Sequence, residues 1–147
     1  MASYEETLVS ISLDADASIA VDTRPPYVDN DDPAGGSAAA GFQYRFVRVT
    51  DDHTVGLYTN TSGEVPVGVL QNKPQVVGMA AQVGISGISL VEAGGDVTAG
   101  ATVTPDATGR GVVGGDGSPC GIAIYGGAEG ELIPVLIRPT TTGSTTA

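Results

Sequence analysis

Glycines spaced like those of a nucleotide-binding loop occur in the second half of the chain. Gly109, Gly111 and Gly114 fit the pattern G-x-G-x-x-G. A dinucleotide site needs this loop between a strand and a helix, because the N-terminus of the helix holds the pyrophosphate. Here the loop is followed by Gly-Asp-Gly-Ser-Pro, which does not begin a helix. We therefore interpret the segment as a glycine-rich hairpin and predict no cofactor.

An acidic run, Asp29-Asn-Asp-Asp32, has the composition of a calcium-binding loop. An EF-hand loop counted from Asp29 needs Gly at position 34 and a bidentate Glu at position 40, but both positions are Ala. We predict no dedicated metal site here, and incidental cation binding by these carboxylates is the alternative.

The single histidine and the single cysteine do not complete a catalytic site. A nucleophile activated by His53 would need a positioned Ser or Thr, and the sequence has no G-x-S-x-G motif. A zinc site would need more strong ligands than His53 and the distant Cys120. We expect His53 to be a turn or surface residue and Cys120 to be a small buried side chain. The protein is predicted not to be an enzyme.

The charge balance excludes two classes of partner. Six Lys and Arg residues face seventeen Asp and Glu residues, giving a formal net charge of −11. Such a surface is repelled by phosphate backbones and by anionic lipid, so we predict no nucleic acid partner and no membrane partner. The first residues show no signal peptide, and the uncharged run 76–91 is too short and polar to span a bilayer. We expect a soluble, unsecreted protein.

The spacing of turns predicts an all-β fold. The chain holds 22 Gly and 9 Pro, and extended segments recur about every ten residues without a helical period. We predict a small barrel or sandwich of short strands, of the β-tulip or SH3-like type. The segment Phe42–Val49, with its alternating aromatic residues, is the clearest strand. The expected strands are 7–13, 42–49, 54–59, 65–71, 76–86, 88–92, 97–104, 120–125 and 131–137.

Composition divides the chain into three parts. Residues 1–41 are predicted to be an N-terminal strand followed by an acidic Pro/Gly-rich arm, residues 42–138 a β domain, and residues 139–147 a flexible low-complexity tail. The extended N-terminal segment has the pattern of a strand that pairs with a neighbouring chain. The residues predicted to contact a neighbour are Leu8, Val9, Ile11, Leu13 and Tyr27.

The last predicted strand is apolar on both of its faces. Ile133, Val135 and Ile137 alternate with Leu132, Pro134 and Leu136. A strand of this kind is either buried on both sides or meets another subunit.

Several segments of the second half together resemble the capsid decoration, or cement, proteins of tailed bacteriophages. The similar segments lie between residues 65 and 138, and the long acidic stretch 14–41 has no counterpart in the pattern. The resemblance implies a β protein on the outer surface of the virion, made in the host cytoplasm. It further implies a homotrimer that bridges adjacent subunits of the major capsid protein. The segments that carry it are 68–74, 83–91, 93–94, 99–100, 106–110, 121–123 and 130–137.

Two other classes remain open at this point. One is a different virion β module, such as a tail or fibre component. The other is a carbohydrate-binding surface domain, although sugar sites usually present aromatic platforms and this chain has no Trp, five Tyr and two Phe.

Overall fold

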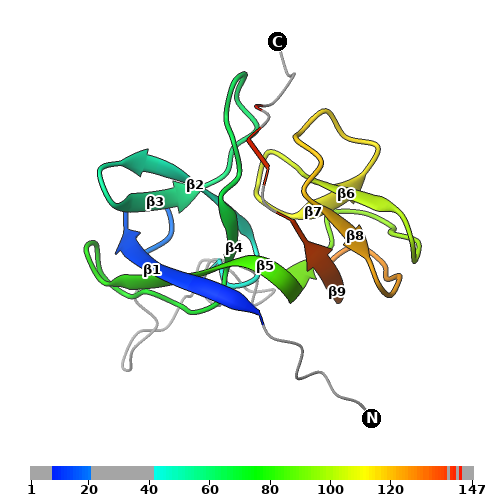
Figure 1. Cartoon of the computed structure of the whole chain (residues 1–147), viewed down its shortest axis with the longest axis horizontal. Coiled ribbons are helices and arrows are strands. Elements are labelled where there is room, and N and C mark those ends of the chain that lie inside the picture. Colours follow the sequence, from blue (N-terminus) through cyan, green and yellow to red (C-terminus); the bar gives the residue numbers. More distant parts are fainter. Residues whose placement is uncertain (1–7, 21–41, 139, 142, 144–147) are drawn as a thin grey trace, which may run out of the picture.

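The computed structural model describes residues 8–20, 42–138, 140, 141 and 143, and all of their regular structure is β. This confirms the all-β prediction. Figure 1 shows the strands arranged as two curved halves that share one long strand. The strands are β1 (Val9–Ala15), β2 (Phe46–Asp51), β3 (Thr54–Leu57), β4 (Gly68–Leu70), β5 (Ala80–Glu92), β6 (Thr102–Pro105), β7 (Gly111–Val113), β8 (Gly121–Ala123) and β9 (Leu132–Ile137).

The strands form one nine-stranded sheet that curls on itself. Their order is β1-β3-β2-β4-β5-β9-β8-β6-β7, and an additional pairing of β1 with β5 closes the first part into a ring. We call this closed part, from β1 to the first half of β5, the first ring. The remaining part, from the second half of β5 through β9, β8, β6 and β7, is called the second sheet. A bridge between Ala93 and Gly111 brings β7 back toward the end of β5.

Strand β5 belongs to both halves and bends where it passes between them. Its residues up to Ser86 pair with β1, and its residues from Gly87 onward pair with β9. Gly87 has a φ of 113°, a conformation that side chains with a Cβ rarely adopt. The sequence prediction had two strands, 76–86 and 88–92, where the structure has one strand bent at this glycine.

Two apolar clusters fill the two halves. The core of the first ring consists of Ala15, Ile19, Val47, Val55, Leu70, Ala81 and Val83. The second cluster consists of Phe46, Tyr58, Val69, Val91, Ala93, Val97, Val103, Cys120, Ala123, Ile133, Val135 and Ile137. Phe46 and Val47 are neighbours in β2 whose side chains enter different clusters, so the ring and the second sheet share structural elements.

The glycine-rich segment that resembled a nucleotide-binding loop is a β-hairpin, as predicted. Strands β6 and β7 pair antiparallel, and Asp106 organises the turn between them. One oxygen of Asp106 accepts hydrogen bonds from the backbone N–H of Thr108 and Arg110, each at 2.9 Å. Gly109 has a φ of 78°, and its carbonyl accepts a 2.7 Å hydrogen bond from Phe46 N–H. The hairpin therefore docks on β2 of the first ring.

The predicted strand 42–49 begins later than the alternation indicated. Residues 42–45 form a turn, in which Tyr44 has a φ of 69°, and β2 starts at Phe46. Arg45, which the alternation placed on a polar side, is 6% exposed. The short strand β7 was missed because it is only Gly-Val-Val between two glycine turns.

The N-terminal strand is a structural part of the first ring. β1 pairs antiparallel with β5 along Val9–Asp14 and parallel with β3 at Asp14 and Ala15. After β1 the chain turns at Asp16, which accepts a 2.8 Å hydrogen bond from Ser18 N–H, and buries Ile19 in the ring core. The edge of β1 toward β5 is therefore occupied within the chain, and the predicted pairing of this strand with a neighbouring chain stays a prediction for its other edge.

Candidate contact surface

An apolar surface lies on the outward side of the second sheet, where no described residue covers it, and we call it the outer face. Its side chains form rows across three strands, because the register places Ile122 beside Leu136 and Leu136 beside Ile88. The next row pairs Leu90 with Pro134. The complete set is Ile88 and Leu90 of β5, Leu132, Pro134 and Leu136 of β9, and Ile122 and Ile124 in and after β8.

The outer face is exposed although its residues are aliphatic. Leu132 is 48% exposed, Ile124 41%, Leu90 37% and Ile122 36%. A hollow of about 430 Å³ opens beside Ile88, Leu90 and Pro134. Contiguous apolar surface of this kind is uncommon on monomers and typical of protein contacts.

The alternation in β9 places one set of its side chains in the core and the other set on the outer face. Ile133, Val135 and Ile137 are at most 2% exposed and fill the second cluster. The residues between them face outward. Of the two alternatives that the sequence left open for this strand, burial on both sides does not occur within the described residues.

Charged groups lie at the ends of the outer face rather than within it. Glu92 pairs with Leu132 at one end, and its carboxylate is held by Arg45 at 3.2 Å. Arg138 follows β9 at the other end. A partner can therefore cover the rows without burying an unpaired charge, which would be costly.

Of the residues predicted to contact a neighbour, some are packed inside the protein and others are exposed. Leu13 packs against the core of the first ring, and Leu8 is half-buried, with its methyl groups over Gly84. Val9 and Ile11 are 49% and 37% exposed. Tyr27 lies outside the described residues. Sequence reasoning missed the outer face as a set, because its members come from three strands whose register the sequence does not show.

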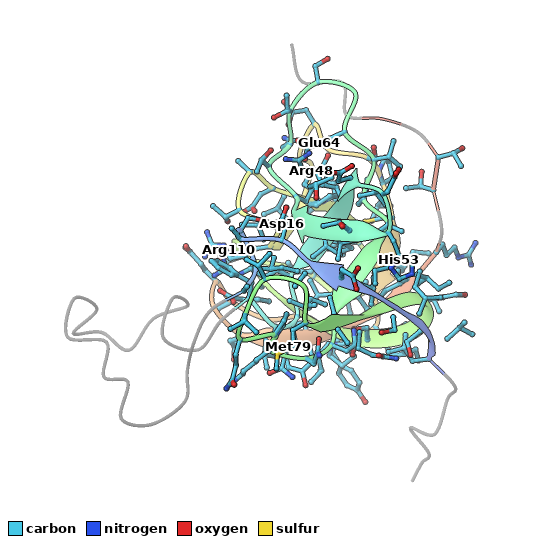
Figure 2. The ribbon with its side chains drawn as sticks, turned by 90° about the vertical axis from the view of Figure 1, so that its left-hand side faces the viewer. Asp16, Arg48, His53, Glu64, Met79 and Arg110 are labelled. Carbon is cyan, nitrogen blue, oxygen red and sulfur yellow. The ribbon has the colours of Figure 1, made fainter. Side chains whose placement is uncertain are left out.

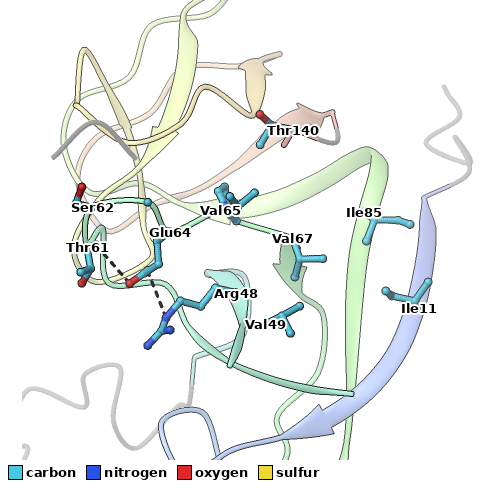
Figure 3. Close-up of a pocket in the computed structure, with 12 residues that line it drawn as sticks. Ile11, Arg48, Val49, Thr61, Ser62, Glu64, Val65, Val67, Ile85 and Thr140 are labelled. Atoms are coloured by element: carbon cyan, nitrogen blue, oxygen red, sulfur yellow. Dashed lines mark hydrogen bonds and ion pairs between the residues drawn. The ribbon is translucent and has the colours of Figure 1, made fainter. Parts of the chain in front are cut away.

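A second apolar surface lies at one end of the first ring, where a groove of about 730 Å³ opens. Figure 3 shows Ile11, Val49, Val67 and Ile85 directed toward this space from different strands and loops. We call it the ring groove.

A carboxylate organises the turn beside the ring groove. Glu64 accepts hydrogen bonds from Thr59 N–H and Thr59 Oγ1, each at 2.7 Å, and lies 3.4 Å from Arg48 Nε. Figure 2 shows Arg48 and Glu64 together at the end of the molecule. Burial raises the pKa of Glu64. The hydrogen bonds from Thr59, the charge of Arg48 and a hydrogen bond from Thr61 lower this pKa by more than burial raises it, so the net shift is downward. The turn is therefore held by an ionised carboxylate.

The two residues considered for catalysis, His53 and Cys120, lie in different environments. His53 is a turn residue with a φ of 55°, and its Nδ1 is 3.6 Å from Asp14 on the surface. Cys120 is buried, and this burial raises the pKa of its thiol to about 12. Both placements agree with the sequence interpretation. Among the described residues no three His, Cys, Asp or Glu side chains group as metal ligands. The described part also contains no helix that is long and apolar enough to cross a bilayer.

Comparisons with known proteins bear on the fold. No protein-family model matches the sequence, and no curated protein matches it. Among solved structures, the chain matches the head fiber gp8.5 N base in bacteriophage phi29 with a TM-score of 0.57. The two proteins share a fold. Their sequences are 18% identical, and the match covers 95% of this chain and 100% of the phage fibre base. The agreement therefore extends over both the first ring and the second sheet.

Proposed function

We propose that this protein is a structural component of a phage virion that binds the exterior of the assembled capsid. The observation that carries the proposal is the outer face, an apolar surface without charge at its centre. The fold shared with a phage head fibre base supports the same setting. So does the resemblance of the second half to capsid decoration proteins. The proposal includes no catalytic step.

In the finer form of this proposal, the protein is a decoration protein that clamps adjacent major capsid subunits. A clip that binds the assembled lattice better than free subunits stabilises the lattice by that difference in affinity. Three copies joined as a homotrimer would engage three sites at once, so that each single contact can be modest. The acidic surface either keeps the unbound protein soluble until a shell exists, or it matches basic patches on the capsid, in which case binding weakens as salt rises.

A second candidate is the base of a head fibre, favoured by the matched structure itself. The two candidates predict different distributions on the particle. A cement protein covers the lattice at symmetric positions between capsomers, whereas a fibre base carries a projecting shaft. Cryo-electron microscopy of particles with and without the protein distinguishes these two patterns.

Binding of the outer face is tested with Leu132→Lys. Leu132 is 48% exposed, so the fold tolerates a lysine there, while a partner that covers the outer face would have to bury the new ammonium group. We expect at least ~10-fold weaker binding to capsids assembled without this protein, measured by co-sedimentation. Val77→Lys is the matched control, because Val77 is 66% exposed in the turn before β5.

Wild-type retention by Leu132→Lys, with a circular dichroism spectrum that shows a folded protein, would contradict the proposed use of the outer face. Equal loss of binding by Val77→Lys would do so as well, since the effect would then be one of added charge.

A further inference from the structure

The ring groove is lined by apolar side chains that face the inside of the first ring but lie beyond the end of its buried core. In β1, Ala15 is 1% exposed, Leu13 is half-buried and Ile11 is 37% exposed. In β2 the same change takes place between Val47, which is fully buried, and Val49, which is 56% exposed. The open end of the ring thus presents an apolar floor that lacks a cover within the described residues.

Beside this floor, one edge of β1 pairs with no other described strand along part of its length. Odd-numbered residues of β1 direct their backbone groups to β5, as the 2.9 Å hydrogen bond from Ala15 N–H to the Met79 carbonyl shows. Even-numbered residues face β3, as the 2.8 Å bond from Asp14 N–H to the His53 carbonyl shows. The pairing of β1 with β3 begins at Asp14, so in the described part of the chain no strand pairs with this edge at Ser10 and Ser12.

Acidic groups lie where the unpaired edge ends. Asp14 has a side chain that is 52% exposed, and Asp51 and Asp52 lie in the β2–β3 hairpin that pairs with it. Arg48, on the opposite side of the ring groove, is engaged by Glu64 at 3.4 Å. The carboxylates beside the edge therefore outnumber the one described basic side chain there, His53, whose Nδ1 lies 3.6 Å from Asp14.

We propose that the ring groove receives an extended segment of a partner protein. The segment adds a strand to β1 at Ser10 and Ser12, inserts alternate aliphatic side chains between Ile11 and Val49, and places a Lys or Arg near Asp14. Strand addition supplies affinity through the backbone, and the apolar floor supplies selectivity. This site lies on the first ring and goes beyond the proposed function of the outer face.

The composition of the chain favours a foreign segment over a second copy. The N-terminal residues include Glu5 and Glu6, and the stretch 21–41 is acidic, so both would meet like charge at this site. The tail 139–147 has no large apolar side chain to fill the floor.

The first experiment uses the synthetic peptide acetyl-Lys-Val-Thr-Val-Thr-Val-Lys-amide with the full-length, ¹⁵N-labelled protein. We expect binding that shifts the amide resonances of Ser10 and Ser12 and slows their exchange with solvent. A peptide with Glu at both ends should bind at least ~10-fold more weakly, and acetyl-Lys-Thr-Thr-Gly-Thr-Thr-Lys-amide, with the same charge but no aliphatic side chain, should not bind. Failure of the first peptide to bind at 1 mM, or equal binding of all three, overturns the proposal.

The second experiment removes a single donor from the edge. In Ser12→Pro the lost N–H is one that faces away from β5, so the pairing that closes the ring stays intact. We expect this variant to fold and to bind the Val-rich peptide at least ~10-fold more weakly, while Ser12→Ala binds as the wild type does. Val49→Asp should also abolish binding, and Leu132→Lys should leave it unchanged. Loss of peptide binding in Leu132→Lys, or its persistence in Ser12→Pro, would refute the site without affecting the proposed role of the outer face.

Discussion

At the residue scale, the buried ion pair between Arg45 and Glu92 joins the two halves of the molecule. Arg45 is 6% exposed and contacts both oxygens of Glu92 at 3.2 Å, and it donates a 3.1 Å hydrogen bond to the Thr108 carbonyl. Its guanidinium lies 5.3 Å from the ring centroid of Phe42. The pair therefore links the turn before β2, the end of β5 and the β6–β7 hairpin.

Glu92→Gln removes the charge of a carboxylate whose two oxygens accept hydrogen bonds from the buried Arg45 guanidinium. We expect Glu92→Gln to lower the free energy of unfolding by about 3–5 kcal/mol, measured by urea titration. The comparison variant is Glu129→Gln, since Glu129 is 64% exposed and lies 3.5 Å from Arg110. That surface change should cost at most about 0.5 kcal/mol. Equal losses of unfolding free energy in the two variants would show that the Arg45–Glu92 pair stabilises the protein no more than a surface ion pair does.

At the element scale, β1 closes the first ring and cannot be treated as an appendage. The predicted division of the chain, with a β domain confined to residues 42–138, implies that residues 1–20 could be deleted and leave a folded domain. The structure predicts the opposite, because the deletion removes the partner of β5 and β3 together with the buried Ala15 and Ile19. We expect the deletion to abolish the cooperative thermal transition seen by circular dichroism.

Two substitutions within residues 1–20 test whether the buried side chains of this segment stabilise the ring. Ile19→Ala creates a cavity in the ring core and should cost about 2–5 kcal/mol, whereas Val9→Ala, at a position 49% exposed, should cost at most about 0.5 kcal/mol. A truncated protein that melts as the wild type does would mean that the ring closes without β1.

At the scale of the whole molecule, the two halves should unfold together. β5 runs through both, and Phe46 of the ring strand β2 belongs to the second cluster. We expect modification of Cys120 by a thiol reagent, followed along a urea gradient, to coincide with the loss of far-ultraviolet circular dichroism. The thiol is buried with a pKa of about 12, so it reacts when the second cluster opens. A labelling midpoint well below the circular dichroism midpoint would instead indicate that the second sheet opens independently.

The sequence by itself determined the fold class and the segments in which most of the strands lie. Frequent glycines and short β-branched runs specify strands rather than helices, since side-chain alternation is a local property. The same local properties identified the glycine-rich hairpin segment, although not strand β7 itself, the surface position of His53 and the two apolar faces of β9.

The tertiary structure alone decided which of these segments meet. Register and ring closure depend on pairings between residues far apart in the chain, such as Val9 with Ser86 and Ile122 with Leu136. For this reason the outer face and the ring groove were not visible in the sequence, and the pairing of the N-terminal strand with β5 was not predicted. The burial of Arg45 has the same cause, because its partner Glu92 lies 47 positions along the chain.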